Sequence, residues 1–220
     1  MCGRFVQKTD LRIVASLFDA PIIESHVAAS YNIAPRQPIA VIMEKGHRKI
    51  VTMKWGLIPY WAEDPAIANH LINARSETVA QKPSFRDSLE KRRCIIIADG
   101  FYEWQGTGLA KKPFYVYMKN EHPFGMAGLF DYWTSAKGEK EITCTIITTE
   151  ANELMKPIHH RMPVILDPRD FGSWLNTVET DVRKVMGLLR PCESKLLLAH
   201  EVGLAVNNAG HNAPDCILPA

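Results

Sequence analysis

RRCIIIADGFYEW, residues 92–104, is the stretch that best indicates the fold. It contains a continuous apolar run from Cys94 to Ala98, which has the length of a strand and is far too short to span a membrane. Asp99 and Gly100 are turn residues, and the aromatic-rich run that follows them is typical of a second short strand. A buried strand, a turn and another strand are therefore expected here.

The segments on either side of this stretch extend the pattern. Alternating or continuous apolar runs predict further strands at 39–44, 49–55, 113–118, 124–130, 142–149, 161–166 and 195–200, the first two forming a hairpin around Gly46. Helical spacing or capping predicts helices at 9–20, 167–175 and 180–190 and one helical turn at 152–156. Because the strands and helices do not alternate, we expect an α+β fold on a mostly antiparallel sheet. No Pro-, Gly- or Ser-rich linker divides the chain, so residues 1–220 are predicted to form a single domain.

Composition is ordinary for a globular protein and narrows the range of partners. The chain has 220 residues, of which 46% are hydrophobic and 23% charged, and its formal net charge is +2. Any site for a polyanion must therefore be a local basic patch. The cysteines are odd in number, five, form no C-x-x-C pair and follow no signal-like opening. These features indicate a reduced, cytosolic protein with mostly buried thiols.

The second residue of the chain is a cysteine, at a position where most proteins have an expendable tail. Gly3 permits close approach of a ligand, and Arg4 supplies a fixed cation. If Met1 is removed, Cys2 presents an α-amine with a pKa of about 7.7–8.0 beside a thiol with a pKa of about 8.5. Such a 1,2-aminothiol reacts with an aldehyde to give a Schiff base and then a thiazolidine, and proximity favours the ring closure. The alternative is a small buried hydrophobic residue near a terminus.

Two further segments contain candidate site residues. In LINARSET (71–78), Asn73 and Arg75 lie on one face if the segment is extended, and Arg75 offers a bidentate fork for phosphate or carboxylate. The alternative is a loop with an Asx-turn and a surface arginine. Glu103 stands among three aromatic residues, where burial would raise its pKa toward the range of a general acid or base. The alternative for Glu103 is an ion pair with an arginine.

PIHHRMPVIL (157–166) places two adjacent histidines before a predicted strand. If the run is extended, His159 and His160 point to opposite faces and are poor ligands for one metal ion. No nearby cysteine or acidic residue completes a zinc pattern, so no metal and no cofactor is expected. One histidine acting as an acid, a base or a stabiliser of an imine is the more plausible role.

Six motifs in this order cover most of the chain and together give a specific resemblance: MCGRF (1–5), YNIAP (31–35), WGLIPYW (55–61), INARSET (72–78), ADGFYEW (98–104) and IHHRMPVIL (158–166). The set resembles the SOS-response-associated peptidase family, also called SRAP-domain or abasic-site shield proteins. The resemblance implies one α+β domain with a barrel-like antiparallel sheet and flanking helices. It also implies a basic groove for single-stranded DNA containing abasic sites. We expect a monomer that works in the cytoplasm on DNA and has no membrane association.

The resemblance assigns roles to four catalytic residues. It implies autocatalytic removal of Met1, after which Cys2 captures the ring-opened aldehyde of an abasic site as a thiazolidine. Asn73 would sense the abasic site near the Cys2 amine. Glu103 would open the sugar and reverse the crosslink, and His159 would stabilise the imine and a sugar hydroxyl.

The resemblance also implies a set of DNA-binding residues. Arg4 and Arg75 would anchor phosphates or the active site, and Trp61 would stack on a base or separate two strands. Stacking of a base on an aromatic side chain contributes about 1–3 kcal/mol. Arg161 and the basic run 91–93 are candidates to extend the groove, although basic runs are usually solvated faces.

This chain departs from the family pattern at two positions. His160 stands where family members often have an acidic residue after the histidine, and repulsion from it would lower the pKa of His159. Ala62 follows Trp61 where some members have a second aromatic residue, which puts a double-aromatic wedge in doubt.

Two other functions fit the same residues. One is a cysteine peptidase that uses Cys2, His159 and Glu103, with release of Met1 as its minimal activity. The other is a non-covalent single-stranded DNA-binding module in which Cys2 is inert.

Overall fold

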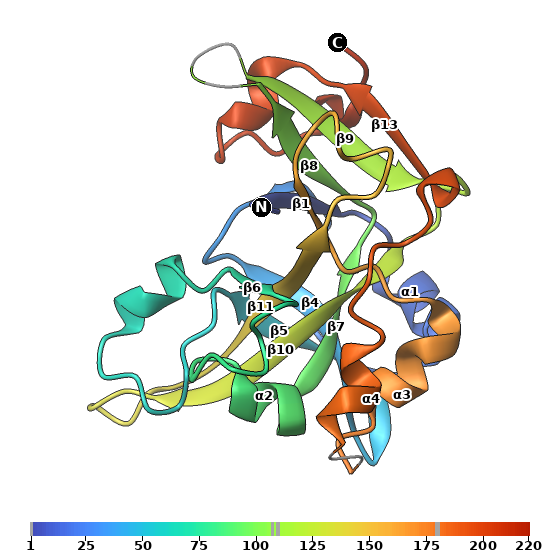
Figure 1. The fold of residues 1–220 in the computed structure, drawn as a ribbon. Coiled ribbons are helices and arrows are strands. Elements are labelled where there is room, and N and C mark those ends of the chain that lie inside the picture. The colour runs from blue at the N-terminus through green and yellow to red at the C-terminus, as the bar shows by residue number, and fades with distance from the viewer. Residues whose placement is uncertain (1, 107, 109–110, 179–180) are drawn as a thin grey trace.

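The computed structural model describes residues 2–106, 108, 111–178 and 181–220. Five long strands form a closed barrel, which occupies the lower half of Figure 1: β4 (Pro38–Lys45), β5 (His47–Trp55), β7 (Arg93–Ala98), β10 (Phe124–Thr134) and β11 (Lys140–Glu150). They pair antiparallel in the order β11-β10-β7-β4-β5. A parallel pairing of β5 with β11 then closes the ring, with Cys144 opposite Trp55. The predicted α+β fold on a mostly antiparallel, barrel-like sheet is thus confirmed.

Three short strands extend the barrel sheet. β2 (Ile22–Glu24) pairs parallel with β5, and β6 (Asn73–Arg75) pairs parallel with β11. β12 (Arg161–Pro163) pairs antiparallel with the end of β11. Both β6 and β12 therefore join the carboxyl-terminal part of the same long strand, and this brings the INARSET and IHHRMP motifs together.

A second, fully antiparallel sheet lies above the barrel in Figure 1. Its strands are β1 (Arg4–Gln7), β3 (Ser30–Ile33), β8 (Gly100–Gln105), β9 (Lys112–Met118) and β13 (Leu197–Glu201), in the order β13-β9-β8-β1-β3. The chain passes directly from the barrel strand β7 into β8 of this second sheet. The strand, turn and strand predicted from residues 92–104 are therefore present, but the two strands belong to different sheets and do not form a hairpin.

Asp99 holds the start of the chain at this junction. Its buried carboxylate accepts hydrogen bonds from the backbone N–H groups of Lys8 (2.5 Å) and Thr9 (3.0 Å) and from the Thr9 hydroxyl. The backbone N–H of Asp99 in turn donates to the carbonyl oxygen of Val6 (2.8 Å). A buried carboxylate needs several donors, and here they come from the two residues that follow β1.

Gln7 joins β1 to the barrel. Its buried side-chain amide donates to the carbonyl oxygens of Ala40 (2.8 Å) and Ile97 (2.9 Å), and its Oε1 accepts from the backbone N–H of Ala40 (2.9 Å). These bonds satisfy the amide on strands β4 and β7, so the first residues of the chain are fixed between the two sheets.

The apolar run of β7 is continuous because both of its faces are buried. Ile96 and Ala98 lie in one core cluster with Phe5, while Ile95 and Ile97 lie in a second cluster with residues of the helical layer. A strand that is covered on both sides does not alternate between apolar and polar residues.

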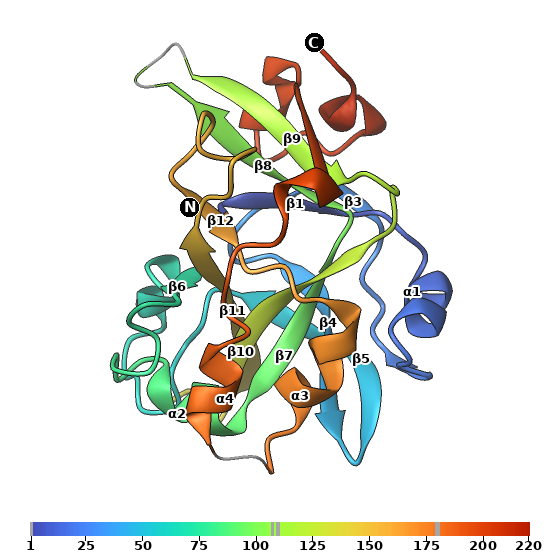
Figure 2. The same cartoon turned by 45° about the vertical axis from the view of Figure 1, so that its right-hand side comes forward.

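Helices cover the outer side of the barrel, and Figure 2 shows α1, α3 and α4 along its flank. The helices are α1 (Leu11–Leu17), α2 (Arg86–Lys91), α3 (Phe171–Leu175) and α4 (Val182–Met186), with single 3-10 turns η1 (Pro65–Asn69), η3 (Pro168–Asp170), η4 (Ser194–Leu196), η5 (Leu204–Asn207) and η6 (Pro214–Ile217). Phe18, which follows α1, stacks on Phe171 of α3 with ring centroids 5.2 Å apart. α1 begins at Leu11 because the Asp10 side chain caps it by accepting from the backbone N–H of Arg12 (2.8 Å).

Several predicted boundaries differ from the structure. The strand expected over 161–166 ends as β12 at Pro163, after which Ile165 makes an isolated bridge to Met126. The helix expected over 180–190 is only α4, and the start of that predicted range lies outside the described residues. The strands β1, β2, β3 and β6 and the helix α2 were not predicted. All five cysteines are free thiols and four of them are buried. In the described part of the chain, no helix is long and apolar enough to cross a membrane.

Candidate active site

Cys2 lies two residues before the start of β1, with its side chain fully buried. β1 pairs with β8 so that Arg4 is opposite Tyr102, and this brings the start of the chain next to Glu103. Burial raises the pKa of the Cys2 thiol well above its ordinary range, and the negative charge of Glu103 raises it further. The thiol is therefore protonated in this form of the protein.

Asn73 holds the main chain of Cys2. It belongs to β6, where it lies opposite Ile146 of β11, and its Nδ2 donates to the carbonyl oxygen of Cys2 (2.8 Å). The Oδ1 atom of Asn73 is buried and accepts no hydrogen bond from the described residues. Asn73 and Arg75 both lie in the extended segment β6, with Asn73 half-buried and Arg75 exposed. The buried, unsatisfied oxygen beside Cys2 leaves Asn73 with an acceptor for a ligand.

Glu103 is 3% exposed, among aromatic and apolar neighbours on β8. Burial raises the pKa of its carboxyl group, as the sequence predicts. Its Oε1 is 3.9 Å from Nδ1 of His159. Glu103 is thus a carboxyl group that holds its proton more tightly than a solvent-exposed glutamate, directly beside Cys2 and an imidazole.

His159 ends a helical turn at 152–159, where its backbone N–H donates to the carbonyl oxygen of Met155 (2.8 Å). Its Nδ1 lies 3.0 Å from the backbone nitrogen and 3.1 Å from the carbonyl oxygen of Arg161. A neutral imidazole accepts from that N–H when its proton is on Nε2 and donates to that carbonyl when its proton is on Nδ1. Burial lowers the pKa of His159, which favours the neutral ring. In either tautomer the Arg161 backbone orients the ring.

The two adjacent histidines do not point to opposite faces. The rings of His159 and His160 are stacked at a tilt, with centroids 4.4 Å apart and planes 31° apart, because the chain bends here and becomes extended only at Arg161. Repulsion from His159 lowers the pKa of His160, while the lowered pKa of His159 comes mainly from burial.

Arg161 is engaged with protein groups. Its guanidinium makes a bidentate ion pair with the Glu77 carboxylate (2.5 and 3.0 Å) and donates to the carbonyl oxygen of Thr148 (2.7 Å). Its side chain is 10% exposed. This ion pair joins the segment that carries His159 to the segment that carries Asn73, and the backbone of Arg161 orients the His159 ring. A role of Arg161 in DNA binding stays a prediction.

Arg4 is also held by protein groups. Its Nη1 donates to Oδ1 of Asn32 (2.8 Å) and to the carbonyl oxygen of Val206 (2.7 Å). Burial lowers the pKa of its guanidinium, which nevertheless remains charged. By contrast, Arg75 is exposed at the end of β6 and close enough to His160 to contribute to lowering the pKa of that ring.

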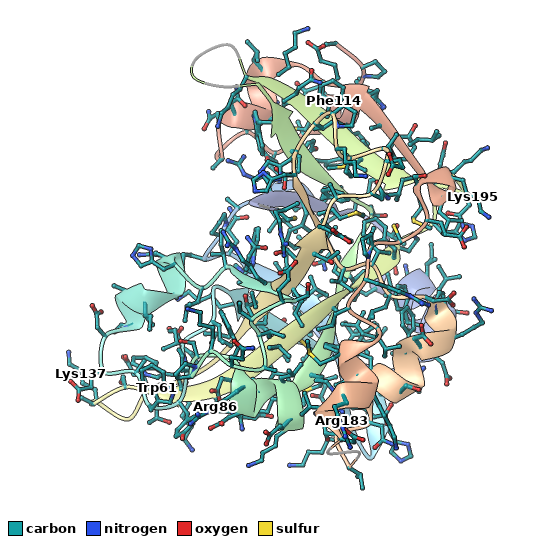
Figure 3. The ribbon with its side chains drawn as sticks, viewed as in Figure 1. Trp61, Arg86, Phe114, Lys137, Arg183 and Lys195 are labelled. Atoms are coloured by element: carbon teal, nitrogen blue, oxygen red, sulfur yellow. The ribbon has the colours of Figure 1, made fainter. Side chains whose placement is uncertain are left out.

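Trp61 lies outside this cluster. It is 47% exposed, and Figure 3 places it near the β10–β11 hairpin, away from the chain start marked in Figure 1. The loop that carries it is fixed because Trp133 Nε1 donates to the carbonyl oxygen of Ala62 (2.7 Å). Any nucleic acid that contacts both Trp61 and Cys2 must therefore span the face between them.

The basic run 91–93 does not form a basic face. Arg93 is buried and donates to the carbonyl oxygens of Trp174 (2.6 Å) and Leu89 (2.7 Å). Arg92 pairs with Asp131 (3.1 Å), so only Lys91 of the run is fully exposed. Contributions of this run to a groove are correspondingly small.

The structure thus brings Cys2, Asn73, Glu103 and His159 together from four separate segments of the chain. Sequence reasoning missed Glu77, which lies inside the INARSET motif, and Asn32, which lies inside YNIAP. The sequence did offer a clue to Glu77, because it is a carboxylate in the same motif as the candidate residue Arg75. Nothing in the local sequence identifies its partner, because the Arg161–Glu77 pair forms only when β6 and β12 meet on β11.

The fold and this cluster define a two-sheet barrel protein with a buried cysteine beside a glutamate, a histidine and an asparagine. The sequence profile of the SOS response associated peptidase (SRAP) family matches residues 1–209, so the chain belongs to that family.

Similar proteins include an abasic site processing protein of Bacillus subtilis, YoqW, which is 41% identical over 221 residues with 99% of each chain covered. The abasic site processing protein HMCES of Gallus gallus is 35% identical, covering 89% of this chain and 68% of that protein. Among solved structures, a protein from Bacteroides thetaiotaomicron superposes with a TM-score of 0.91 at 29% identity over 100% of both chains.

Proposed function

We propose that this protein processes abasic sites in single-stranded DNA by capturing them covalently on Cys2 after removal of Met1. The observation that carries the proposal is the hydrogen bond from Asn73 to the Cys2 carbonyl oxygen. This bond holds Cys2 beside Glu103 and His159. The relatives named as abasic site processing proteins support the same substrate. The family is described as associated with the SOS response, which is consistent with a role in DNA damage.

The covalent step joins an aldehyde to an aminothiol. The α-amine of Cys2 attacks the aldehyde carbon of the ring-opened abasic sugar, and the resulting carbinolamine loses water to give an imine. The Cys2 sulfur then adds to the imine carbon while the thiol proton passes to the nitrogen, which closes a thiazolidine. One water molecule is released overall, and no oxidant or metal is consumed.

The neighbouring groups suit the proton transfers of this sequence. The raised pKa of Glu103 lets its carboxyl group donate a proton to the departing hydroxyl and accept one when the sugar opens. The protonated thiol of Cys2 indicates that the amine, rather than sulfur, attacks first. The neutral imidazole of His159 is a hydrogen-bonding partner for a sugar hydroxyl. Reversal of the crosslink would use the same groups in the opposite order.

Removal of Met1 exposes the reactive amine. Hydrolysis of the peptide bond between Met1 and Cys2 adds one water molecule and frees methionine, and in this proposal Glu103 acts as its general base. In this proposal the peptidase activity is limited to the protein's own first residue.

DNA binding in this proposal rests on a few cations and one aromatic residue. Arg75 and Trp61 are exposed and available to a phosphate and a base, whereas Arg4 is half-buried and Arg161 is buried. The affinity for single-stranded DNA should fall with salt, with a log–log slope of about −0.7 per phosphate contacted. The protein would therefore be DNA-associated.

A general cysteine peptidase fits the geometry less well. Such an enzyme needs a thiolate activated by a histidine. Here burial raises the pKa of Cys2 and lowers that of His159, and Nδ1 of His159 is engaged by the Arg161 backbone. Each of these features disfavours a thiolate–imidazolium pair.

The proposal is tested by incubating the protein with a single-stranded oligonucleotide that contains one abasic site and separating the products on a denaturing gel. We expect an adduct that is absent with the intact oligonucleotide and absent for Cys2→Ala. The matched control is Cys192→Ala, which changes a partly exposed thiol outside the cluster. Equal binding of intact and abasic strands without an adduct would instead favour the non-covalent module. Turnover of unrelated peptides would favour a general peptidase.

A further inference from the structure

A second cluster of chemically active side chains lies in the carboxyl-terminal segment, outside the site described above. One ring nitrogen of His211, one carboxylate oxygen of Asp215 and the thiol Sγ of Cys216 all lie within 4.8 Å of one another. Nε2 of His211 is 2.8 Å and 2.9 Å from the two carboxylate oxygens of Asp215. Cys216 is 1% exposed, whereas the side chains of His211 and Asp215 are 35% and 54% exposed. The cluster thus has a buried thiol at its base and two donors open to solvent.

The local fold fixes these three side chains together. Pro214 begins the 3-10 turn η6, in which the backbone N–H of Cys216 donates to the carbonyl oxygen of Ala213 (3.1 Å). The carbonyl oxygen of His211 accepts from Nδ2 of Asn32 on β3 (2.7 Å). The backbone on both sides of the turn is therefore held before any ligand binds, which lowers the entropic cost of assembling a site.

The donor set indicates which ions would fit. A thiolate, an imidazole nitrogen and a carboxylate are ligands that Zn²⁺ accepts in tetrahedral sites, with a water molecule in the remaining position. Ligand distances of about 2.0–2.3 Å place the donor atoms of such a site roughly 3.2–3.8 Å apart. The three side chains need to move only slightly from their present separations to reach this arrangement. Mg²⁺ and Ca²⁺ prefer all-oxygen sites and would not select a thiol.

We propose that His211, Asp215 and Cys216 form a binding site for Zn²⁺ or a similar thiophilic divalent cation. The ion takes the place of the proton shared between His211 and Asp215, and the Cys216 thiol releases its proton as it binds.

The site has a direct structural connection to β1 and β3. The same segment supplies the carbonyl oxygen of Val206 to Arg4 (2.7 Å) and those of Val206 (3.2 Å) and Asn208 (3.0 Å) to Asn32. A bound ion would therefore stabilise the segment that holds Arg4 in place. The inference does not depend on abasic-site capture.

The test uses the reduced, metal-free full-length protein titrated with Co²⁺ and then with Zn²⁺. Cobalt bound to a thiolate gives a sulfur-to-metal charge-transfer absorption band, and Zn²⁺ should displace it. We expect one equivalent of metal per chain, with the band lost in Cys216→Ser and the affinity reduced at least tenfold in His211→Gln. Circular dichroism checks that these variants fold. If Cys216→Ser does not fold, the exposed substitution Asp215→Asn gives an independent test of metal affinity.

Two controls separate this site from other thiols and imidazoles. Cys192→Ser changes a thiol elsewhere, and His200→Gln changes a nearby imidazole whose Nε2 is already bonded to the carbonyl oxygen of Ile217 (2.9 Å). Both controls should keep the band and the affinity. Cys2→Ala should also keep them, because the ion does not bind at the first cluster. Absence of the band in the parent protein, its loss in Cys2→Ala, or its persistence in Cys216→Ser would overturn the proposal.

Discussion

Nδ2 of Asn73 donates a hydrogen bond to the main-chain carbonyl oxygen of Cys2, across 2.8 Å. The two residues come from different parts of the chain. Asn73 is positioned by the pairing of β6 with β11, and Cys2 is positioned by the pairing of β1 with β8. It fixes the residue whose amine and thiol are proposed to react.

Asn73→Ala should slow crosslinking more than it lowers stability. The substitution removes one hydrogen bond, worth about 0.5–1.5 kcal/mol, and leaves the Cys2 backbone less well oriented. Misplacement of a reacting group can cost a rate factor of about 100. Single-turnover crosslinking with an abasic oligonucleotide measures the effect. The control Asn120→Ala, in an exposed loop, should keep the parent rate. A rate for Asn73→Ala within twofold of the parent, a difference of only about 0.4 kcal/mol in activation free energy, would contradict this role.

Glu103→Gln should change how stability depends on pH. Burial raises the pKa of Glu103, so the folded protein holds that proton more tightly than the unfolded chain. The contribution of Glu103 to the free energy of unfolding therefore falls as pH rises from the unfolded value, about 4.3, through the raised folded-state pKa.

Denaturant unfolding at several pH values measures this contribution as the difference between the parent and Glu103→Gln. The parent should lose stability relative to the variant between acid and neutral pH. Glu63→Gln, an exposed surface change, should run parallel to the parent. Parallel curves for Glu103→Gln would show that its carboxyl group is not perturbed.

His159→Gln should raise the pKa of His160. Repulsion from the neighbouring ring is the largest cause of the lowered pKa of His160, whose ring centroid is 4.4 Å from that of His159. Without it, the pKa of His160 should move toward the ordinary value of about 6.5. NMR titration of the ring carbon resonances measures the change, with His70→Gln as a distant control. An unchanged titration of His160 would rule out the coupling.

Trp61→Ala should weaken DNA binding without destabilising the fold. Its ring is 47% exposed, and a base stacked on it would contribute about 1–3 kcal/mol, a loss of roughly 5- to 150-fold in affinity. Fluorescence anisotropy with a labelled single strand measures the affinity, and thermal unfolding checks stability. Tyr60→Ala, an exposed aromatic neighbour, provides the control. An affinity for Trp61→Ala equal to that of the parent would remove Trp61 from the binding surface.

Much of the fold follows from local pattern, and the exceptions have physical causes. The barrel strands were predictable because their apolar runs are long enough to cross a core. β1, β3 and β6 have only three or four residues each, and they become strands only through pairing with longer neighbours. The local sequence does not predict which strands they pair with.

The same distinction applies to the candidate site. The burial of Glu103 was predictable because aromatic residues surround it in the sequence. The partners of Arg4 and Arg161 were not predictable, because Asn32 and Glu77 reach them only after the sheets assemble. The tilted stacking of His159 on His160 depends on a bend in the backbone, which a pattern of adjacent histidines does not reveal.

The most direct test of the central claim is the intact mass of the purified protein before and after incubation with an abasic oligonucleotide. We predict that the protein lacks one methionine residue before incubation. Afterwards it should gain the mass of the oligonucleotide less one water molecule, with no gain for Cys2→Ala. A protein that retains Met1 and yet forms the adduct, or a Cys2→Ala variant that gains the same mass, would contradict capture by the Cys2 aminothiol.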